Sequence, residues 1–265
     1  MWTANRTMTP QDTARPYARL HDGGARDELS QTNSLTRKLK RFSCFSAEDR
    51  AALDELEHSS EWISAARPIL REGESVDMIL PLLEGLAYRH KDLSGGRRQI
   101  LALLLPGDIC AGHARRPFPV DYGVRALTRV RVARIPRDRF DRILAGHGAI
   151  ARALATAALI EEAVLRAWLV NLGQRDARER VAHLICELAR RMEDCGLLLG
   201  HGGFDLPLTQ QELGSALGLT NVHVNRILRR LRDENLMDLQ RGVVRIHDLE
   251  RLQRVADFDP AYLSS

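Results

Sequence analysis

The stretch LTNVHVNRILRRLR, residues 219–232, combines hydrogen-bonding and cationic side chains with a regular apolar frame. The apolar residues recur at steps of three and four, which predicts a helix with one buried face. These residues are Val224, Ile227, Leu228 and Leu231. The opposite face carries asparagines and arginines; asparagine can pair bidentately with adenine, and arginine with guanine or phosphate. The pattern therefore predicts a helix that reads DNA.

The residues on either side of this helix predict a winged helix-turn-helix. Thr209 can cap a first helix over residues 210–217, and Thr220 can cap the second. Gly214 is small where the two helices cross, and Gly218 permits the positive φ of a tight turn. The segment LQRGVVRIHD that follows predicts two short strands around a glycine turn, which would form the wing.

The side chains expected to contact DNA lie on the exposed sides of both helices and in the wing. They are Thr209, Gln210, Gln211, Asn221, Val222, His223, Asn225, Arg226, Arg229, Arg230 and Arg241. The first residues of a recognition helix enter the major groove, so residues 221–225 would read bases and the later arginines would hold phosphate. The alternative is an arginine-rich helix whose exposed face meets only solvent.

Upstream, the periodicity changes twice. From about residue 61 to 136, short apolar runs alternate with turn signals, which predicts an antiparallel barrel or jelly roll. The helical period then returns, and a hinge is expected at residues 171–174, before an amphipathic helix. The polar start of the chain has no periodicity, and we expect it to be disordered. The expected parts are a disordered extension (1–33), a β-roll sensor (34–148), a dimerisation helix (149–173) and a DNA-binding domain (174–265).

The long helix has apolar residues at alternating steps of four and three, which is typical of a two-helix seam. The predicted dimer interface consists of Leu154, Ala158, Glu161, Leu165, Trp168 and Leu172. Glu161 is an imperfection in that seam. The alternative is a helix that packs only on its own chain.

Composition narrows the class of protein. The chain has 265 residues and a net charge of +4, so a DNA-binding patch would have to be local. Its four cysteines form no C-x-x-C pair, and no H-E-x-x-H, G-x-S-x-G or phosphate-loop motif occurs. We therefore expect no enzymatic activity and no bound metal. The charged long helix and the polar N-terminus predict a cytoplasmic protein without a membrane segment.

The order of these parts resembles the CRP/FNR family of bacterial transcription regulators. REGES, LLLPGD and VRALTRVRVARIPRDRF are similar to the family's roll, and LTQQELGSALGLTNVHVNRILRRLRDENLM to its DNA-binding module. TNVHVNR and VADFDPAYL are similar to a subgroup found in alphaproteobacteria. The resemblance covers about Asn33 to the C-terminus. It implies an α+β chain with a cyclic-nucleotide-binding-like β-roll, a long dimerisation helix and a winged helix-turn-helix.

The resemblance also implies a function and partners. It implies a homodimer that binds palindromic promoter sites in double-stranded DNA and contacts RNA polymerase. Thr209 and Gln210 would contact phosphate, and Asn221, Val222, Asn225 and Arg226 would face bases. Better-known members carry an arginine–glutamate pair where this chain has Asn221 and Val222, so their target sequence does not transfer.

The sensor departs from the family's cyclic-nucleotide binders. Val120 and Asp121 stand where those proteins place an arginine–serine pair on the phosphate, so we expect no cyclic AMP binding. The N-terminal cysteine set of the family's iron–sulfur members is missing, so we expect no cluster. Cys110 and His113 are the candidates for an effector or redox site, or else a buried thiol and a hydrogen-bonded imidazole. The signal stays open, and the alternatives are an effector-independent regulator or a ligand-binding protein that does not bind DNA.

Overall fold

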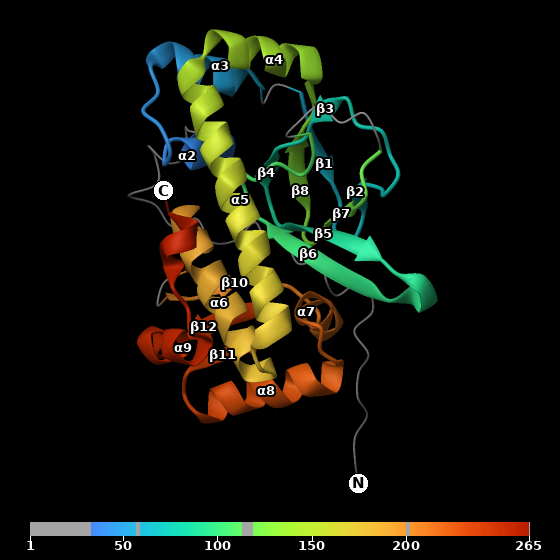
Figure 1. Ribbon diagram of the computed structural model, residues 1–265, viewed down its shortest axis with the longest axis vertical. Helices are drawn as coiled ribbons and strands as arrows, with labels where there is room; N and C mark the ends of the chain where they lie inside the picture. Colours follow the sequence, from blue (N-terminus) through green and yellow to red (C-terminus); the bar gives the residue numbers. More distant parts are fainter. Residues whose placement is uncertain (1–32, 57–58, 113–118, 200–201, 265) are drawn as a thin grey trace. The chain divides into compact units, whose positions relative to one another are not determined.

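The computed structural model describes residues 33–56, 59–112, 119–199 and 202–264 (Figure 1). The predicted disordered extension, residues 1–33, lies outside the described residues except for Asn33. The helices are α2 (Ser34–Leu39), α3 (Ala47–Glu55), α4 (Arg137–Gly146), α5 (Gly148–Gln174), α6 (Ala177–Asp194), α7 (Gln210–Leu217), α8 (Asn221–Asp233) and α9 (Leu249–Ala256), with short 3-10 turns η2 (Ser94–Gly96) and η4 (Pro260–Leu263). The strands are β1 (Ser60–Ile63), β2 (Pro68–Leu70), β3 (Met78–Ile79), β4 (Leu82–Glu84), β5 (Ala87–Asp92), β6 (Arg98–Leu104), β7 (Gly123–Ala126), β8 (Val130–Ala133), β9 (Ile135–Pro136), β10 (Phe204–Asp205), β11 (Met237–Gln240) and β12 (Val243–Ile246).

The strands from β1 to β9 form the predicted β-roll. One antiparallel sheet has the order β2-β7-β5-β6 and another has the order β1-β8-β4, while β3 pairs with β9. Apolar residues of both sheets form one buried cluster, which includes Leu70, Leu82, Val124 and Val132. Short strands with turns between them thus close over a shared core, as the alternating pattern predicts.

The roll is covered by helices from both ends of its sequence. Ser46 caps α3 through a capping box with Asp49. The carboxylate of Asp49 also lies 2.8 Å from Nδ1 of His147, the residue between α4 and α5. A buried cluster joins α2 and α3 to the start of α5, and contains Leu39, Leu53, Phe140 and Ile150 among others.

Helix α5 continues to Gln174, so the hinge expected at residues 171–174 is helical. The chain breaks one residue later because Asp176 caps α6 in a capping box with Glu179, and Arg175 before it is extended. The guanidinium of Arg175 donates to the carbonyl of Ala256, which ties this break to α9.

Among the described residues no single helix is long and apolar enough to cross a bilayer; only α4 and α5 taken together, across a 114° bend, pass that test.

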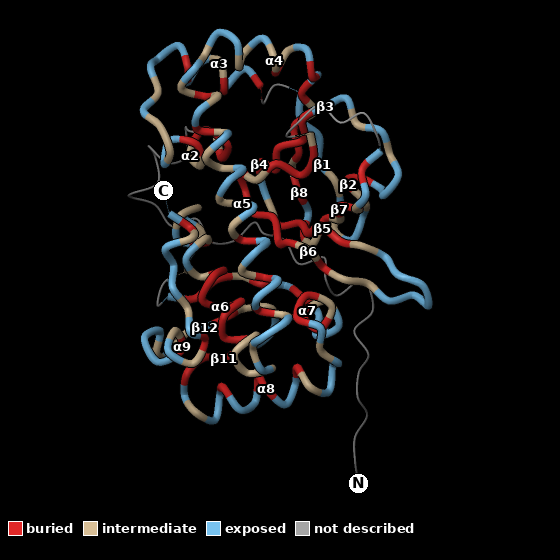
Figure 2. The backbone as a smooth tube through the Cα atoms, in the orientation of Figure 1, coloured by how far each residue is buried: buried red, intermediate tan, exposed pale blue. Residues whose placement is uncertain are grey.

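Helix α6 is the centre of the C-terminal half (Figure 2). The apolar face predicted for it is buried in full: Val181, Leu184, Ile185, Leu188 and Met192. These residues belong to one large cluster that also includes Tyr88 and Ile100 of the roll and Leu213 and Val224 of the helix-turn-helix. The roll and the DNA-binding module therefore share a core in this structure.

A turn of the roll contributes charge to this contact. Asp108 accepts a 2.7 Å hydrogen bond from the amide of Leu105 and forms ion pairs with Lys38 of α2 and, at 3.0 Å, with Arg191 of α6. Burial alone would raise the pKa of Asp108, but the two cations outweigh it and lower that pKa to about 2.

This depressed pKa predicts how stability depends on acid. An acid whose pKa is lower in the folded state stabilises the fold above its unfolded pKa, near 4, and loses that contribution as the pH falls toward 2. The wild type should therefore be more stable than Asp108→Asn at pH 5. This difference in the free energy of unfolding should shrink by about 2 kcal/mol between pH 5 and pH 2. Urea unfolding followed by circular dichroism at several pH values measures this. A gap between the two proteins that stays constant with pH would show that Asp108 is not ionised and paired as described.

Candidate nucleic-acid interface

The two helices of the helix-turn-helix are set by local bonds that the sequence predicts. The side chain of Thr209 accepts from the amide of Glu212, in a capping box that starts α7. Gly218 ends α7 with a φ of 64°. A Cβ on Gly214 would lie 2.4 Å from the carbonyl oxygen of Leu219, so only glycine lets the turn approach α7 this closely.

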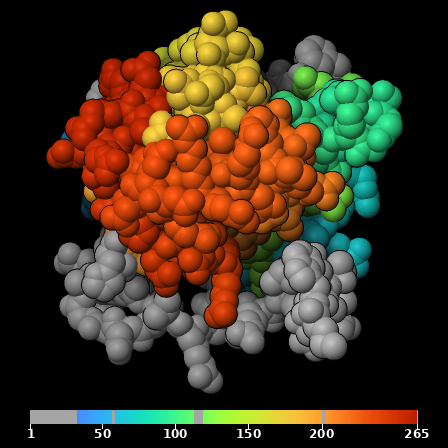
Figure 3. Space-filling view, turned by 90° about the horizontal axis from the view of Figure 1, so that it is seen from below, coloured from blue at the N-terminus to red at the C-terminus, as the bar shows by residue number. Residues whose placement is uncertain are grey.

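Helix α8 divides into the two faces expected from its sequence. Thr220 caps it, and its buried residues are Val224, Ile227, Leu228 and Leu231. The other face is exposed to solvent. Val222 lies on this face and is 79% exposed. Residues of α7 and α8, orange in Figure 3, occupy the middle of the face seen from below. The residues predicted to contact DNA from these helices, from Thr209 to Arg230, are exposed except His223, which is half-buried.

Several of these side chains are held by neighbours within the chain. The amide of Asn225 donates to the side-chain oxygen of Gln210 on α7 at 2.5 Å. The guanidinium of Arg226 lies 2.7 Å from Nε2 of His223. The structure thus brings readers and candidate phosphate contacts together in two pairs. Both pairs lie on the open face, where DNA would approach.

The last turn of α8 has a different role from its start. Arg230 donates to Glu234 at 2.9 Å, and Glu234 also pairs with Arg178 of α6. The pKa of Glu234 is lowered, chiefly by its bond with Arg178. Arg230 is therefore tied toward the body of the module more than Arg226 is. Its predicted phosphate contact would require it to leave or share this partner.

The predicted wing is present, with one strand more than expected. β11 and β12 pair in antiparallel register, and the turn between them has φ of 51° at Arg241 and 78° at Gly242. Positive φ at both central residues is typical of a tight hairpin turn. Arg241 at its tip is exposed. Strand β10 adds to β12 and is only two residues long, too short for its periodicity to be visible in the sequence.

The structure describes only one of the two effector candidates of the roll, Cys110. Cys110 is fully buried, and burial raises the pKa of its thiol to about 12, so it stays protonated. An oxidant acts on an accessible thiolate, so these properties favour the buried structural thiol over the redox interpretation. His113 lies outside the described residues. Within the part of the chain that is described, no group of His, Cys, Asp and Glu could hold a metal ion.

The described residues in the interior of the roll do not fit a cyclic phosphate. The buried guanidinium of Arg89 donates to the carbonyls of Ile109 and Cys110 and pairs with Glu161 of α5. A phosphate would have to displace these partners. Val120 packs in the core of the roll, and Asp121 is exposed.

The residues of the predicted dimer interface on α5 differ in how far they are exposed in the structure. Ala158 and Leu165 are exposed, and Leu154 and Leu172 are half-buried. Trp168 instead lies in the core, where its indole donates to Glu187 at 3.0 Å. Trp168 and Glu161 therefore make contacts within the chain, contrary to the expectation. The residues at these steps of four and three lie along the border between the buried and the exposed side of α5. The sequence pattern alone could therefore not tell which side packs on the chain itself. The exposed apolar residues of α5 are Leu159, Leu165, Leu169 and Val170.

Two family models match the chain in the order of its parts. A cyclic nucleotide-binding domain matches residues 61–147, and a Crp-like helix-turn-helix domain matches residues 179–255. The first match covers β1 to β9 and α4, and the second covers α6 to α9.

Known proteins resemble the chain over most of its length. The transcriptional activator protein FnrL of Cereibacter sphaeroides is 30% identical over 219 residues, which are 80% of this chain and 86% of that protein. The nitrogen fixation regulation protein FixK of Bradyrhizobium diazoefficiens is 29% identical, over 78% of this chain and 87% of its own. The solved structure of FixK2 from Bradyrhizobium japonicum is similar with a TM-score of 0.65 and 25% identity, covering 74% of this chain and 96% of that one.

The close approach at Gly214 predicts the effect of a single methyl group. Gly214→Ala should lower the free energy of unfolding by about 1–3 kcal/mol, because the backbone oxygen of Leu219 must move away from the new Cβ. Gly146→Ala is the matched control, since nothing lies within 4 Å of a Cβ added at the end of α4. Thermal or urea unfolding compares the two. Equal stability of both variants would mean that α7 and the turn are less tightly packed than described.

Proposed function

Since the chain belongs to the CRP/FNR family of transcription regulators, we propose that it binds palindromic promoter DNA as a homodimer, with α8 of each copy in the major groove. The observation that carries this proposal is the division of α8 into a buried apolar face and an open face with asparagines and arginines. Two such helices would lie about 34 Å apart, one turn of DNA, so the target would have two matching halves.

The proposed contacts divide by residue type. Asn221, Val222 and Asn225 near the start of α8 face bases, together with Arg226. Thr209 and Gln210 at the start of α7 hold phosphate, where the amide groups of a helix N-terminus favour an anion. The remaining contacts from the two helices and the wing also go to the backbone, namely Gln211, His223, Arg229, Arg230 and Arg241. Backbone contacts set the register of the protein on DNA, and base contacts select the sequence.

The other parts of the chain take the remaining roles. Residues 34–148 act as the sensor, α5 as the dimerisation helix, and residues 174–265 as the DNA-binding domain, with RNA polymerase as a further partner. The apolar side chains on the open face of α5 support the dimer, because Leu159 and Leu169 are 64% and 73% exposed in the single chain. Large exposed leucines on one helix face favour burial against a second copy. An effector or a redox signal at the β-roll would control DNA binding. The buried thiol of Cys110 and the partners that already hold Arg89 argue against oxidation of Cys110 and against a cyclic phosphate as that signal.

Loss of one arginine tests the assignment of α8. Arg226→Ala should weaken binding to a promoter fragment by at least about tenfold, because a base or phosphate contact is lost. Fluorescence anisotropy with labelled DNA measures the affinity, which should also fall steeply as salt is raised. Arg142→Ala is a control of equal charge, since Arg142 lies on α4 and pairs with Asp138. If Arg226→Ala binds as tightly as Arg142→Ala, α8 is not the reading helix.

A charge on the open face of α5 tests the dimer. Leu169→Glu should convert the protein from dimer to monomer at micromolar concentration, because a carboxylate would be buried against its counterpart in the second copy. Sedimentation equilibrium measures the mass. Leu93→Glu is the control, since Leu93 is 46% exposed and lies in the turn between β5 and β6 of the roll. A wild-type protein that sediments as a monomer would refute the dimer outright.

A further inference from the structure

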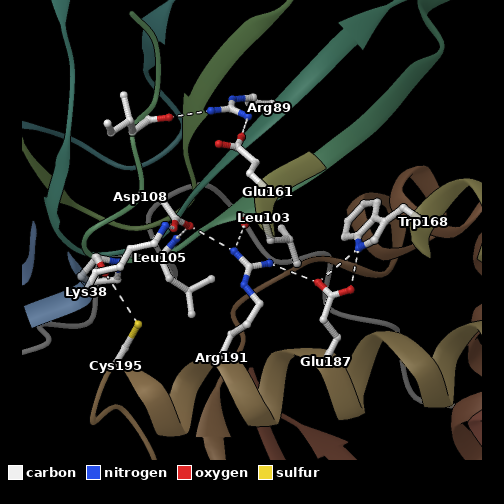
Figure 4. A network of polar contacts seen from close by, with 12 residues as sticks. Lys38, Arg89, Leu103, Leu105, Asp108, Glu161, Trp168, Glu187, Arg191 and Cys195 are labelled. Atoms are coloured by element: carbon white, nitrogen blue, oxygen red, sulfur yellow. Dashed lines mark hydrogen bonds and ion pairs between the residues drawn. The ribbon is translucent and has the colours of Figure 1, made fainter. Parts of the chain in front are cut away.

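A line of charged side chains crosses the boundary between the roll and the DNA-binding module (Figure 4). Lys38 of α2 pairs with Asp108 of the roll, Asp108 pairs with Arg191 of α6 at 3.0 Å, and Arg191 pairs with Glu187 at 3.1 Å. Their side chains are mostly buried, with exposed fractions of 24%, 13%, 17% and 0% in that order. The charges alternate in sign along the whole line.

Two members of the line, Asp108 and Glu187, have further partners on their own side of the boundary. Asp108 accepts from the amide of Leu105 at 2.7 Å. Glu187 accepts from the indole of Trp168 at 3.0 Å and from the hydroxyl of Tyr262 at 3.1 Å. Two bonds of Arg191 cross to the roll, to Asp108 and to the carbonyl of Leu103. These two crossing bonds meet at one arginine.

The position of Lys38 is fixed to the roll by close packing. A Cβ on Gly107, next to Asp108, would lie 2.8 Å from Cβ of Lys38 and 2.7 Å from the carbonyl oxygen of Ser34. Helix α2 and the turn at Asp108 must therefore move as one body. A separation of the two sides would leave Lys38 with Asp108, and Arg191 with Glu187.

A second ion pair crosses the same boundary and has the same design. Arg41, just after α2, pairs with Asp194 at the end of α6 at 2.7 Å. Asp194 has another partner on α6, because Arg190 lies 3.5 Å from it. If Arg41 withdraws, Asp194 keeps Arg190.

We propose that the two crossing ion pairs, Asp108–Arg191 and Arg41–Asp194, form a reversible latch between the sensor and the DNA-binding module. Removing the partner of a buried charge is strongly destabilising. Here the retained pairs Lys38–Asp108 and Arg191–Glu187 avoid that penalty, so the latch can open without isolating a charge. A cavity beside it, bordered by Lys38, Asp108 and Arg191, lets water reach the parting groups.

The latch rests on the proposed function for its effect on DNA. Helix α6 packs against α8 in the shared core, so the latch holds the proposed reading helix at one position relative to the roll. Opening releases α6 and α8 from that position. DNA that prefers one of the two arrangements must shift the latch, and a change in the latch must alter DNA affinity.

Cys195 is a native reporter of the opening. Its sulfur lies 3.6 Å from the carbonyl oxygen of Pro106, across the same boundary, and its side chain is half-buried. In full-length Asp108→Asn the latch loses its charge while the bond to Leu105 can persist, so a thiol reagent should label the thiolate of Cys195 at least about tenfold faster. The charge of Asp108 raises the pKa of Cys195 and that of Lys38 lowers it, so each labelling rate is divided by that variant's thiolate fraction, obtained from the pH dependence of the rate. Asp92→Asn is the control, because Asp92 pairs with Arg98 within the roll. Mass spectrometry assigns the labelled cysteine.

Lys38→Met sharpens the test because its predicted sign is opposite. Without Lys38, opening would leave Asp108 without a charged partner, so Cys195 should label more slowly than in wild type. Cys186 is buried in α6 and reports unfolding. The latch is refuted if Asp108→Asn labels Cys195 no faster than Asp92→Asn, if Cys186 accelerates together with Cys195, or if Lys38→Met accelerates Cys195.

DNA binding tests the second half of the proposal separately. Asp108→Asn should change the affinity for a promoter fragment by at least about fivefold, and Asp92→Asn should leave it unchanged. An unchanged affinity with faster labelling of Cys195 would refute the coupling to DNA. If the wild type binds no DNA, the proposed function fails, while the labelling results still decide whether the latch exists.

Discussion

The carboxylate of Glu187 has no exposure to solvent, and a charge in that position requires partners within the protein. It obtains them from Trp168 on α5, Arg191 on α6 and Tyr262 on η4. Burial raises the pKa of Glu187, although all three partners act in the opposite direction. The geometry around this one acid therefore has to be kept, and it fixes the end of α5 and the C-terminal turn against α6.

The exposed face of α8 depends on this arrangement indirectly, through α6. α8 packs on α6 with its apolar face, and Glu234 at its end pairs with Arg178 at the start of α6. Anchored on that side, α8 needs no polar contact with the core from its other face. Its asparagines and arginines are then available to bind a ligand. The apolar face and Glu234 are enough to hold this cationic helix in the domain.

The helix-turn-helix could be predicted from the sequence because its determinants are local. The capping box of Thr209 with Glu212 spans three residues, and the positive φ of Gly218 depends on the turn itself. The position of Trp168 could not be predicted in this way, because its partner Glu187 lies nineteen residues further on another helix. The same holds for Gln99, whose amide donates to the carbonyl of Ala216 on α7 across 117 residues. Local rules find a helix and its two faces, and the neighbour that covers each face is set by the tertiary fold.

The contacts Gln210–Asn225 and His223–Arg226 join residues proposed to read bases to residues that need not touch a base. Each proposed reader is hydrogen-bonded to its neighbour within the chain. A substitution at Gln210 or His223 would remove that hydrogen bond and present a different donor to the groove. Promoter preference in such a lineage can therefore drift through supporting positions while the readers themselves stay the same, and an operator code inferred from the readers alone would miss the change.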